Sequence, residues 1–143
     1  MALFKFVISD KERSVQVEKD QVECPVVGKK IGEKINGDFL GLDGYELSIT
    51  GGHDKNGFPM RKDIEGGVRR KVLSVRGIGF SGRLRRKKKL KRPIGGLRKR
   101  KTVVGNSISL ETVQINCKIL KQGTKSFSEV FPPKSEPKEE KTE

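Results

Sequence analysis

The chain has 143 residues, a formal net charge of +14 and a hydrophobic fraction of only 32%. This length suits one compact domain with extensions and argues against a second full domain. The excess of 32 basic over 18 acidic residues favours a polyanionic partner, above all nucleic acid. No run of about 20 apolar residues is present and residues 1–5 lack the layout of a signal peptide, so we expect an intracellular protein with no membrane partner.

The first two strands are expected at the N-terminus. In residues 3–9 and 14–18, apolar and polar positions partly alternate and β-branched residues are common. The polar residues 10–13 between them suit a hairpin connection. Cys24 and Cys117 are isolated from each other in the sequence and form no metal-binding motif, so we expect two buried thiols.

Glycines at positions 28, 32, 37, 41 and 44 punctuate the next part of the chain. They disfavour a long helix, although residues 26–34 could form one short helical turn. Residues 45–50 alternate cleanly and predict a strand. Several short strands at such spacing favour a mainly β fold, either a sandwich or, as we expect, a small closed β-barrel-like domain with a basic extended arm and a disordered C-terminal tail.

A glycine-rich motif follows this strand, in residues 49–60. Asp54, Asn56 and Gly57 occupy positions that suit a type I turn, and Gly51 and Gly52 permit close approach of the backbone. Two interpretations remain open: a plain hairpin connection, or an RNA-contacting loop with exposed backbone N–H donors. The motif and turn residues are Gly51, Gly52, Asp54, Gly57, Pro59 and Met60, and Lys55, Arg61 and Lys62 place charge beside them.

The basic residues are concentrated in one segment, because residues 66–110 contain no acidic residue and 16 basic ones. The other 98 residues carry 16 basic and 18 acidic side chains, a net charge of −2. A one-sided segment on a near-neutral body is typical of a binding site rather than of a solvated surface. Its candidate RNA-binding residues are Arg69, Arg70, Lys71, Arg76, Arg83, Arg85, Arg86, Lys87, Lys88, Lys89, Lys91, Arg92, Arg98, Lys99, Arg100 and Lys101.

Within this segment, residues 66–80 are expected to form a strand that continues the barrel, and residues 83–101 a mobile arm. The arm has 12 basic residues among 19, so it repels itself and buries too little apolar surface to order alone. Pro93 and the pair Gly95 and Gly96 predict a corner between residues 83–92 and 98–101. We expect the arm to become fixed only against its partner.

Other readings of a basic run are a nuclear address or a patch for anionic membranes. The segment is too long for the first and too often broken by glycine for the second. RNA is preferred to DNA because no helix-turn-helix, zinc-finger or basic-zipper pattern is present. A free RNA chaperone or regulatory RNA-binding protein remains an alternative on the same residues.

The last strand is expected in residues 112–119, where Val113, Ile115, Cys117 and Ile119 would face a core. From residue 132 onward the sequence has no apolar period and indicates disorder. We therefore expect one β-rich domain in residues 1–125 and a flexible tail in residues 126–143.

Little in the sequence suggests an enzyme, although glycine loops and scattered carboxylates leave a metal- or nucleotide-dependent enzyme as a further alternative. His53 is the single histidine, which leaves almost no material for histidine-based catalysis or a histidine metal site. Residues 77–79 and 28–30 are only fragments of phosphate-loop patterns. Asp54 and Asp63 are better read as a turn cap and a solvated carboxylate than as a catalytic pair. We expect no catalytic residue, no metal and no cofactor.

The string Gly51-Gly52-x-Asp54-x-x-Gly57-x-Pro59-Met60, with the basic arm and the late strand ending at residues 118–123, resembles small-subunit ribosomal protein six of the archaeal and eukaryotic type. The resemblance covers roughly residues 1–125. It implies a β-rich, non-catalytic structural protein that supports translation in the cytoplasm, bound to small-subunit rRNA and neighbouring ribosomal proteins.

The eukaryotic members of that family continue into a long basic helix with regulatory serines. From residue 132 onward this chain has Ser135 as its one serine, so the resemblance favours an archaeal member without that control.

Overall fold

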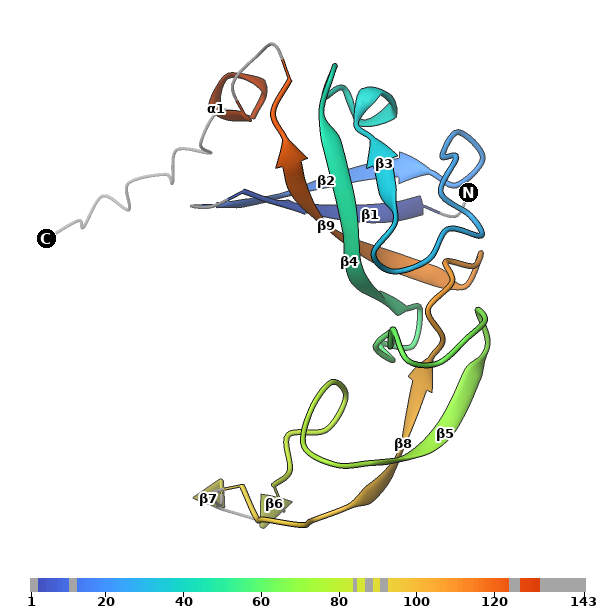
Figure 1. Cartoon of the computed structure of the whole chain (residues 1–143), viewed down its shortest axis with the longest axis vertical. Helices are drawn as coiled ribbons and strands as arrows, with labels where there is room; N and C mark the ends of the chain where they lie inside the picture. Colours follow the sequence, from blue (N-terminus) through green and yellow to red (C-terminus); the bar gives the residue numbers. More distant parts are fainter. Residues whose placement is uncertain are drawn as a thin grey trace, which may run out of the picture.

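The computed structural model describes residues 3–10, 13–83, 85–86, 89–90, 93–123 and 127–131, and in these the fold is mainly β (Figure 1). The elements are β1 (Leu3–Ser9), β2 (Ser14–Asp20), β3 (Lys34–Asn36), the 3-10 helix η1 (Asp38–Leu40), β4 (Glu46–Asp54), β5 (Arg69–Ser74), β6 (Arg85–Arg86), β7 (Lys89–Leu90), β8 (Lys99–Val104), β9 (Thr112–Lys121) and α1 (Phe127–Val130).

Five strands form one curled sheet in the order β2-β1-β9-β4-β3. We call this sheet, with the loops and α1 that cover it, the body. β1 and β9 run parallel, and the other neighbours are antiparallel. The predicted hairpin of β1 and β2 is confirmed, with Ser9 opposite Ser14. The closed barrel is not confirmed: among the described strands, β2 and β3 end the sheet order without pairing to each other, and the sheet is a half-barrel.

The core lies against the concave face of this sheet. Phe4, Phe6 and Ile8 alternate along β1 and are fully buried, as strand geometry requires of residues two positions apart. Cys24 and Cys117 are both buried, which confirms that prediction, and burial raises the pKa of the Cys117 thiol to about 12.

The inward set predicted for β9 needs one correction at its start. Ile115 and Cys117 are buried and Ile119 packs on the core, but Val113 is only half-buried while Thr112 is fully buried. A register shift between His53 and Asp54 lies opposite this end of the strand. A local break in register changes which side chains face inward. The Thr112 hydroxyl then accepts the Ser109 backbone N–H at 3.2 Å.

The chain between β2 and β4 consists of turns, one bridge from Lys30 to Ser107, the short strand β3 and the short helix η1. The short helical turn that residues 26–34 could have formed is absent from this described stretch. Gly28 and Gly32 have φ angles of 86° and 98°, and these left-handed conformations interrupt a right-handed helix. The expectation of tight glycine bends is therefore confirmed here.

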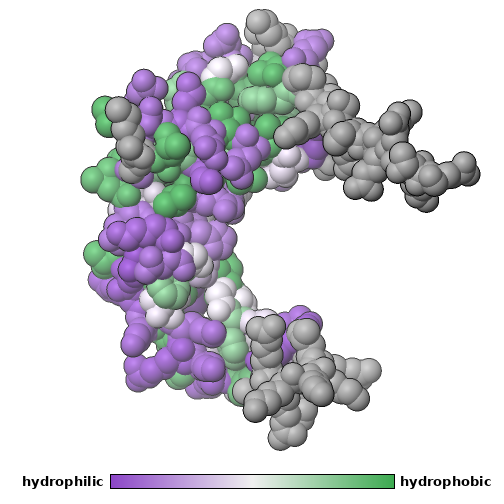
Figure 2. Space-filling view, turned by 180° about the vertical axis from the view of Figure 1, so that it is seen from behind, coloured by the Kyte–Doolittle hydropathy of each residue, from purple (hydrophilic) through white to green (hydrophobic). Residues whose placement is uncertain are grey.

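β5 and β8 form a separate antiparallel pair that projects from the body and curves, with the short β6 and β7 hairpin at its far end (Figure 1). We call residues 69–104 the ribbon. In the space-filling view the molecule is C-shaped, and hydrophilic residues gather over the ribbon (Figure 2).

The structure differs from the expected arm in its second half. Residues 99–101 lie in β8 and pair with β5, because Thr102, Val103 and Val104 continue the strand with β-branched side chains and β5 supplies a partner. The predicted bend at Gly95 and Gly96 is confirmed by a turn in which Gly96 has a φ of 70°.

The body also extends past residue 125. Phe127 in α1 is buried, its carbonyl accepts a hydrogen bond from Arg13 Nη2 at 3.0 Å, and its ring packs edge-on against Phe131. Residues 127–131 therefore belong to the folded body rather than to the predicted tail. The disorder predicted from residue 132 onward concerns residues outside the described part of the chain.

Candidate nucleic-acid interface

The strands and connections of the ribbon carry many exposed basic side chains. Arg70, Lys71, Lys99 and Arg100 lie on β5 and β8 and are exposed, while Lys101 is half-buried with its ammonium 5.8 Å from the centre of the Phe80 ring. Arg76, Arg83 and Arg98, in the connections of the ribbon, are exposed too.

Part of the predicted set falls outside what the structure describes. Arg85, Arg86 and Lys89 lie in β6 and β7, and their side chains are not described. Lys87, Lys88, Lys91 and Arg92 lie outside the described residues. Their roles stay predictions from the sequence.

The register of the ribbon keeps like charges apart. Arg69, Arg70 and Lys71 of β5 lie opposite Val104, Val103 and Thr102, and Lys99, Arg100 and Lys101 of β8 lie opposite Ser74, Leu73 and Val72. No basic residue of one strand faces a basic residue of the other. Like charges directly opposite each other destabilise a strand pair, so this offset allows six cations to share one short ribbon.

Several cations outside the ribbon have acidic partners, whereas most described cations of the ribbon have none. Lys5 pairs with Glu18 at 3.2 Å, and Lys121 and Lys34 pair with Glu46 at 2.9 and 3.6 Å. In the described part of the ribbon, Arg69 is the cation that forms an ion pair. The exposed ribbon cations therefore remain available to an external polyanion.

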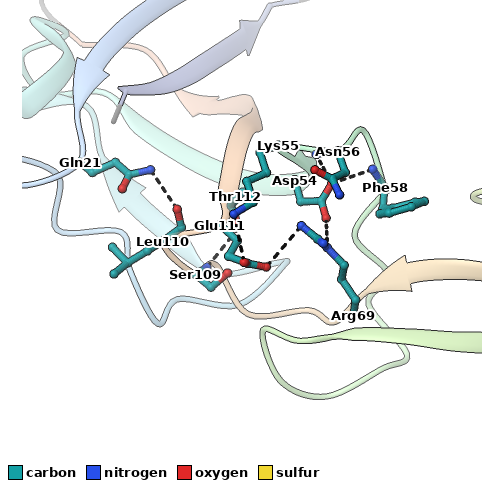
Figure 3. Close-up of polar contacts among 10 residues, drawn as sticks. All are labelled: Gln21, Asp54, Lys55, Asn56, Phe58, Arg69, Ser109, Leu110, Glu111 and Thr112. Carbon is teal, nitrogen blue, oxygen red and sulfur yellow. Dashed lines mark hydrogen bonds and ion pairs between the residues drawn. The ribbon is translucent and has the colours of Figure 1, made fainter. Parts of the chain in front are cut away.

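Arg69 belongs to a polar cluster at the root of the ribbon (Figure 3). Asp54, buried at the end of β4, accepts the backbone N–H groups of Asn56 and Phe58 with Oδ1 at 2.9 and 2.8 Å, and its Oδ2 accepts Arg69 Nε. Arg69 Nη2 lies 3.4 Å from Glu111 Oε2, an ion pair without hydrogen-bond geometry. Lys55 lies 3.3 Å from the other oxygen of Glu111.

The protonation of Asp54 is governed by this cluster. Burial alone would raise its pKa, but the N–H donors of Phe58 and Asn56 and the guanidinium of Arg69 outweigh burial, so the pKa lies below the ordinary value. Asp54 is thus an anion at neutral pH that caps the motif turn, as predicted, and also holds the ribbon to the body. The second role has no signal in the sequence, because Arg69 lies 15 positions further on among other arginines.

Of the two predicted cations that follow the motif, Arg61 is also engaged within the protein. Arg61 grips Asp63 with Nε and Nη2 at 2.9 and 2.6 Å and donates to the Ser74 hydroxyl at 3.4 Å. Asp63 is therefore exposed but paired, and the hydrogen bond from Arg61 lowers its pKa. Lys62 is exposed and has no ion pair among the described residues.

The glycine motif joins the body to the same root. A Cβ on Gly52 would collide with the Gln114 carbonyl of β9, so only glycine fits there. Met60 is buried, its N–H binds the Gly52 carbonyl at 2.9 Å, and the Pro59 carbonyl accepts the Val104 N–H of β8 at 2.9 Å. Gly57 closes the turn by donating its N–H to the Asp54 carbonyl at 2.9 Å, and its φ of 78° is one that glycine adopts readily. The motif is thus a structured junction, and contact with RNA remains a prediction.

The chain matches the family model described as "Ribosomal protein S6e" over residues 4–132. It is 44% identical over 142 residues to the "Small ribosomal subunit protein eS6" of Methanosphaera stadtmanae, covering 99% of each chain. The protein of the same name from Methanothermobacter thermautotrophicus is 44% identical, over 90% of this chain and 94% of its own. That from Methanocaldococcus jannaschii is 43% identical, over 92% of each.

Among the described residues, no helix is long and apolar enough to cross a membrane.

Proposed function

Because the chain belongs to the ribosomal protein S6e family, whose members are structural and not enzymes, we propose that it is a constituent of the small ribosomal subunit that binds and stabilises rRNA. In this role the protein supports translation and is ribosome-bound in the cytoplasm, in contact with rRNA and neighbouring ribosomal proteins. In this proposal residues 66–110 are the main RNA-binding segment. The observation that carries it is the ribbon, whose exposed cations have no acidic partners among the described residues.

The mechanism is neutralisation of phosphate. Lysine and arginine side chains that meet RNA release condensed counterions, so the free energy of binding depends strongly on salt. The β5 and β8 pairing fixes the direction of these side chains before binding, which reduces the entropy lost on association. Arginines such as Arg70 and Arg100 can also grip phosphate with two donors or stack on splayed bases.

Arg69 takes a different part in the proposal. Its guanidinium is held by Asp54 and Glu111 and lies 5.7 Å from the centre of the Phe58 ring. We assign it to positioning the ribbon on the body rather than to direct contact with phosphate. Arg61, paired with Asp63, is assigned the same way at the other side of the root.

The test uses two matched double variants of the full chain. Lys71→Gln with Lys99→Gln removes two unpaired ribbon cations, and Lys5→Gln with Lys121→Gln removes two cations of the body that have carboxylate partners. Binding to in vitro transcribed small-subunit rRNA of Methanosphaera stadtmanae is measured across a salt series. The ribbon variant is expected to lower the slope of log affinity against log salt by about 1.5, since each phosphate contact contributes about 0.7–0.9.

The body variant is expected to leave that slope nearly unchanged. Equal effects of the two variants would show that binding is not localised to the ribbon. A second experiment separates a ribosomal constituent from a free RNA chaperone: the protein should remain with small subunits washed at moderate salt, in stoichiometric amount. Its loss from washed subunits would overturn the proposal.

A further inference from the structure

A groove lies between the end of β4 and the turn of the ribbon that contains Ile78 and Gly79. It has a volume of about 510 Å³ and is lined on one side by Gly51, Gly52 and His53 of β4, and on the other by Ile78 and Gly79. Asn116 of β9 also lines it. In Figure 1 the loop that follows β5 rises from the ribbon toward the lower end of β4. The volume falls in the range of small-molecule pockets, about 300–1,000 Å³.

The groove is uncharged although it adjoins the most basic part of the chain. Among the described residues that line it there is no Asp, Glu, Lys or Arg. Pro59, Met60 and Ile78 supply apolar surface, and Ile78 is 62% exposed. A phosphate would have no cation in this groove. A ligand with a flat, mostly uncharged group and an attached phosphate chain suits this arrangement. The flat group would fit the groove, and the phosphates would meet the basic residues around it.

Two adjacent glycines show that the groove is not a by-product of folding. A Cβ on Gly52 would meet the backbone of β9, so the fold itself requires that glycine. Gly51 has no positive φ, and a Cβ there would meet nothing within 4 Å. The fold would therefore accept a side chain at position 51. Because glycine has none, the floor of the groove stays open. A glycine in a strand interior commonly marks the close approach of a ligand.

Hydrogen-bonding groups border this open floor. Asn116 Oδ1 accepts from Gln114 Nε2 at 2.8 Å, which leaves the amide N–H groups of Asn116 without a partner among the described residues. The backbone N–H groups of Ile78 and Gly79, at the tip of a turn closed by Gly77 and Phe80, form no hydrogen bond in the same part of the chain. His53 adds an imidazole ring, one of the side chains on which RNA bases stack.

We propose that this groove holds a single unstacked base of single-stranded RNA, while the neighbouring ribbon cations bind the phosphates on either side of it. The inference rests on the proposed rRNA binding and adds a site for a base to it. Sequence-specific recognition of RNA generally targets bases splayed out of loops, bulges and ends, stacked on side chains and bonded along their edges. The groove supplies apolar walls and unpaired N–H donors for such a base.

The direct test is a titration of the ¹⁵N-labelled full chain, followed by NMR, with each of the four ribonucleoside monophosphates and separately with inorganic phosphate. The nucleotides should shift the backbone amides of Gly51, Gly52 and Gly79, and phosphate should shift only amides of the basic ribbon. Identical shifts for nucleotide and phosphate, confined to the ribbon, would overturn the base site and leave phosphate neutralisation standing. No binding of either probe, or of rRNA, would overturn the proposed function itself.

Variants give a second, independent readout. Gly51→Leu fills the groove, and Ile78→Ser removes an exposed apolar wall at little cost in stability. Gly77→Leu is the matched control, because a Cβ at Gly77 also meets nothing within 4 Å and Gly77 does not line the groove. Binding is measured to a single-stranded RNA of mixed sequence and to an RNA duplex, and melting temperatures confirm that each variant folds.

Both groove variants should weaken single-stranded RNA binding about tenfold, as expected for the loss of one stacked base. Their salt slope and their affinity for the duplex should match those of the unmodified chain, since the cations are intact. The Gly77→Leu variant should bind both RNAs normally. An unchanged single-strand affinity in Gly51→Leu and Ile78→Ser, or an equal loss for the duplex, would overturn the site.

Discussion

At the scale of single residues, Asp54 is the carboxylate on which the junction of body and ribbon depends. Its two oxygens accept two backbone N–H groups of the motif turn and the guanidinium of Arg69. A buried carboxylate is tolerated because every side of it is met by a donor. Asp63 also pairs with an arginine, but its side chain is 60% exposed. The two aspartates therefore make a matched comparison of buried and solvated ion pairs.

Replacing Asp54 with Asn should lower the free energy of unfolding by about 2 kcal/mol. The amide keeps one oxygen for the two backbone N–H groups, but it places an NH₂ donor against the Arg69 guanidinium and leaves that cation without its buried partner. Asp63→Asn should cost less than about 1 kcal/mol, as exposed ion pairs do. Urea unfolding of the full chain measures both. Equal losses in the two variants would contradict the assignment of Asp54 as the structural carboxylate.

The lowered pKa of Asp54 predicts a pH dependence of stability. The folded-state pKa lies below the ordinary value of 3.8, so the stabilising contribution is fully present above pH 3.8 and is lost as the pH falls through the folded value. The difference in melting temperature between the unmodified chain and Asp54→Asn should be constant near pH 6 and narrow below about pH 3.8. Thermal unfolding from pH 6 to pH 2 checks this, and a difference that grows with acid would have the wrong sign.

At the scale of elements, the register of β5 and β8 places six cations on two short strands without setting any two of them opposite each other. The basic half of β5 faces the uncharged half of β8, and the reverse holds at the other end. Leu73, opposite Arg100, is 59% exposed, so its side chain contributes little to burial. A charged substitution at Leu73 therefore tests the effect of charge on strand pairing with little change in packing.

Leu73→Lys should loosen the ribbon and Leu73→Glu should tighten it, each by about 0.2–1 kcal/mol, because the new charge lies opposite Arg100. Amide hydrogen exchange of β5 and β8 measures the change, and raising the salt concentration should shrink it. Val75→Lys is the control, since Val75 is equally exposed and follows the end of β5. If both lysine variants loosen the ribbon alike, the offset register is not what stabilises it.

The sequence predicted the elements whose patterns are local and missed those decided by distant partners. The alternation in residues 112–119 located β9, and the glycines located the tight turns. The start of β8 could not be predicted, because Lys99, Arg100 and Lys101 continue a basic run and become a strand only beside β5. The roles of Arg69 and Arg70 could not be separated either. They are neighbours of the same type, and only the position of Asp54 distinguishes them.

At the scale of the whole molecule, a near-neutral body carries a strongly cationic ribbon at a fixed angle. Three kinds of contact hold that angle: the Asp54, Arg69 and Glu111 cluster, the Pro59 to Val104 hydrogen bond, and Gly105, where a Cβ would collide with the Gly66 carbonyl. The charged cluster is the contact that can be removed without disturbing the backbone. The direction of the ribbon, and not only its charge, is expected to depend on it.

Arg69→Gln should therefore widen the range of ribbon orientations while both parts stay folded. Residual dipolar couplings of β5 and β8 should fit the same alignment tensor as β1, β4 and β9 in the unmodified chain, and should require a separate tensor in the variant. Lys121→Gln, which loses an ion pair within the body, should keep a single tensor. A single tensor in Arg69→Gln would show that the contacts that remain, the backbone hydrogen bonds and the bond from Arg61 to Ser74, fix the angle without the charged cluster.

The place of β9 in the sheet has a consequence for biosynthesis. β9 lies between β1 and β4, although it is the last strand of the described chain to be made, and it pairs in parallel with the first. Contacts between residues so far apart in sequence form slowly. The sheet cannot be completed until all of residues 66–110 have been synthesised. During translation, the cationic segment therefore emerges ahead of β9, the strand that completes the sheet of the body.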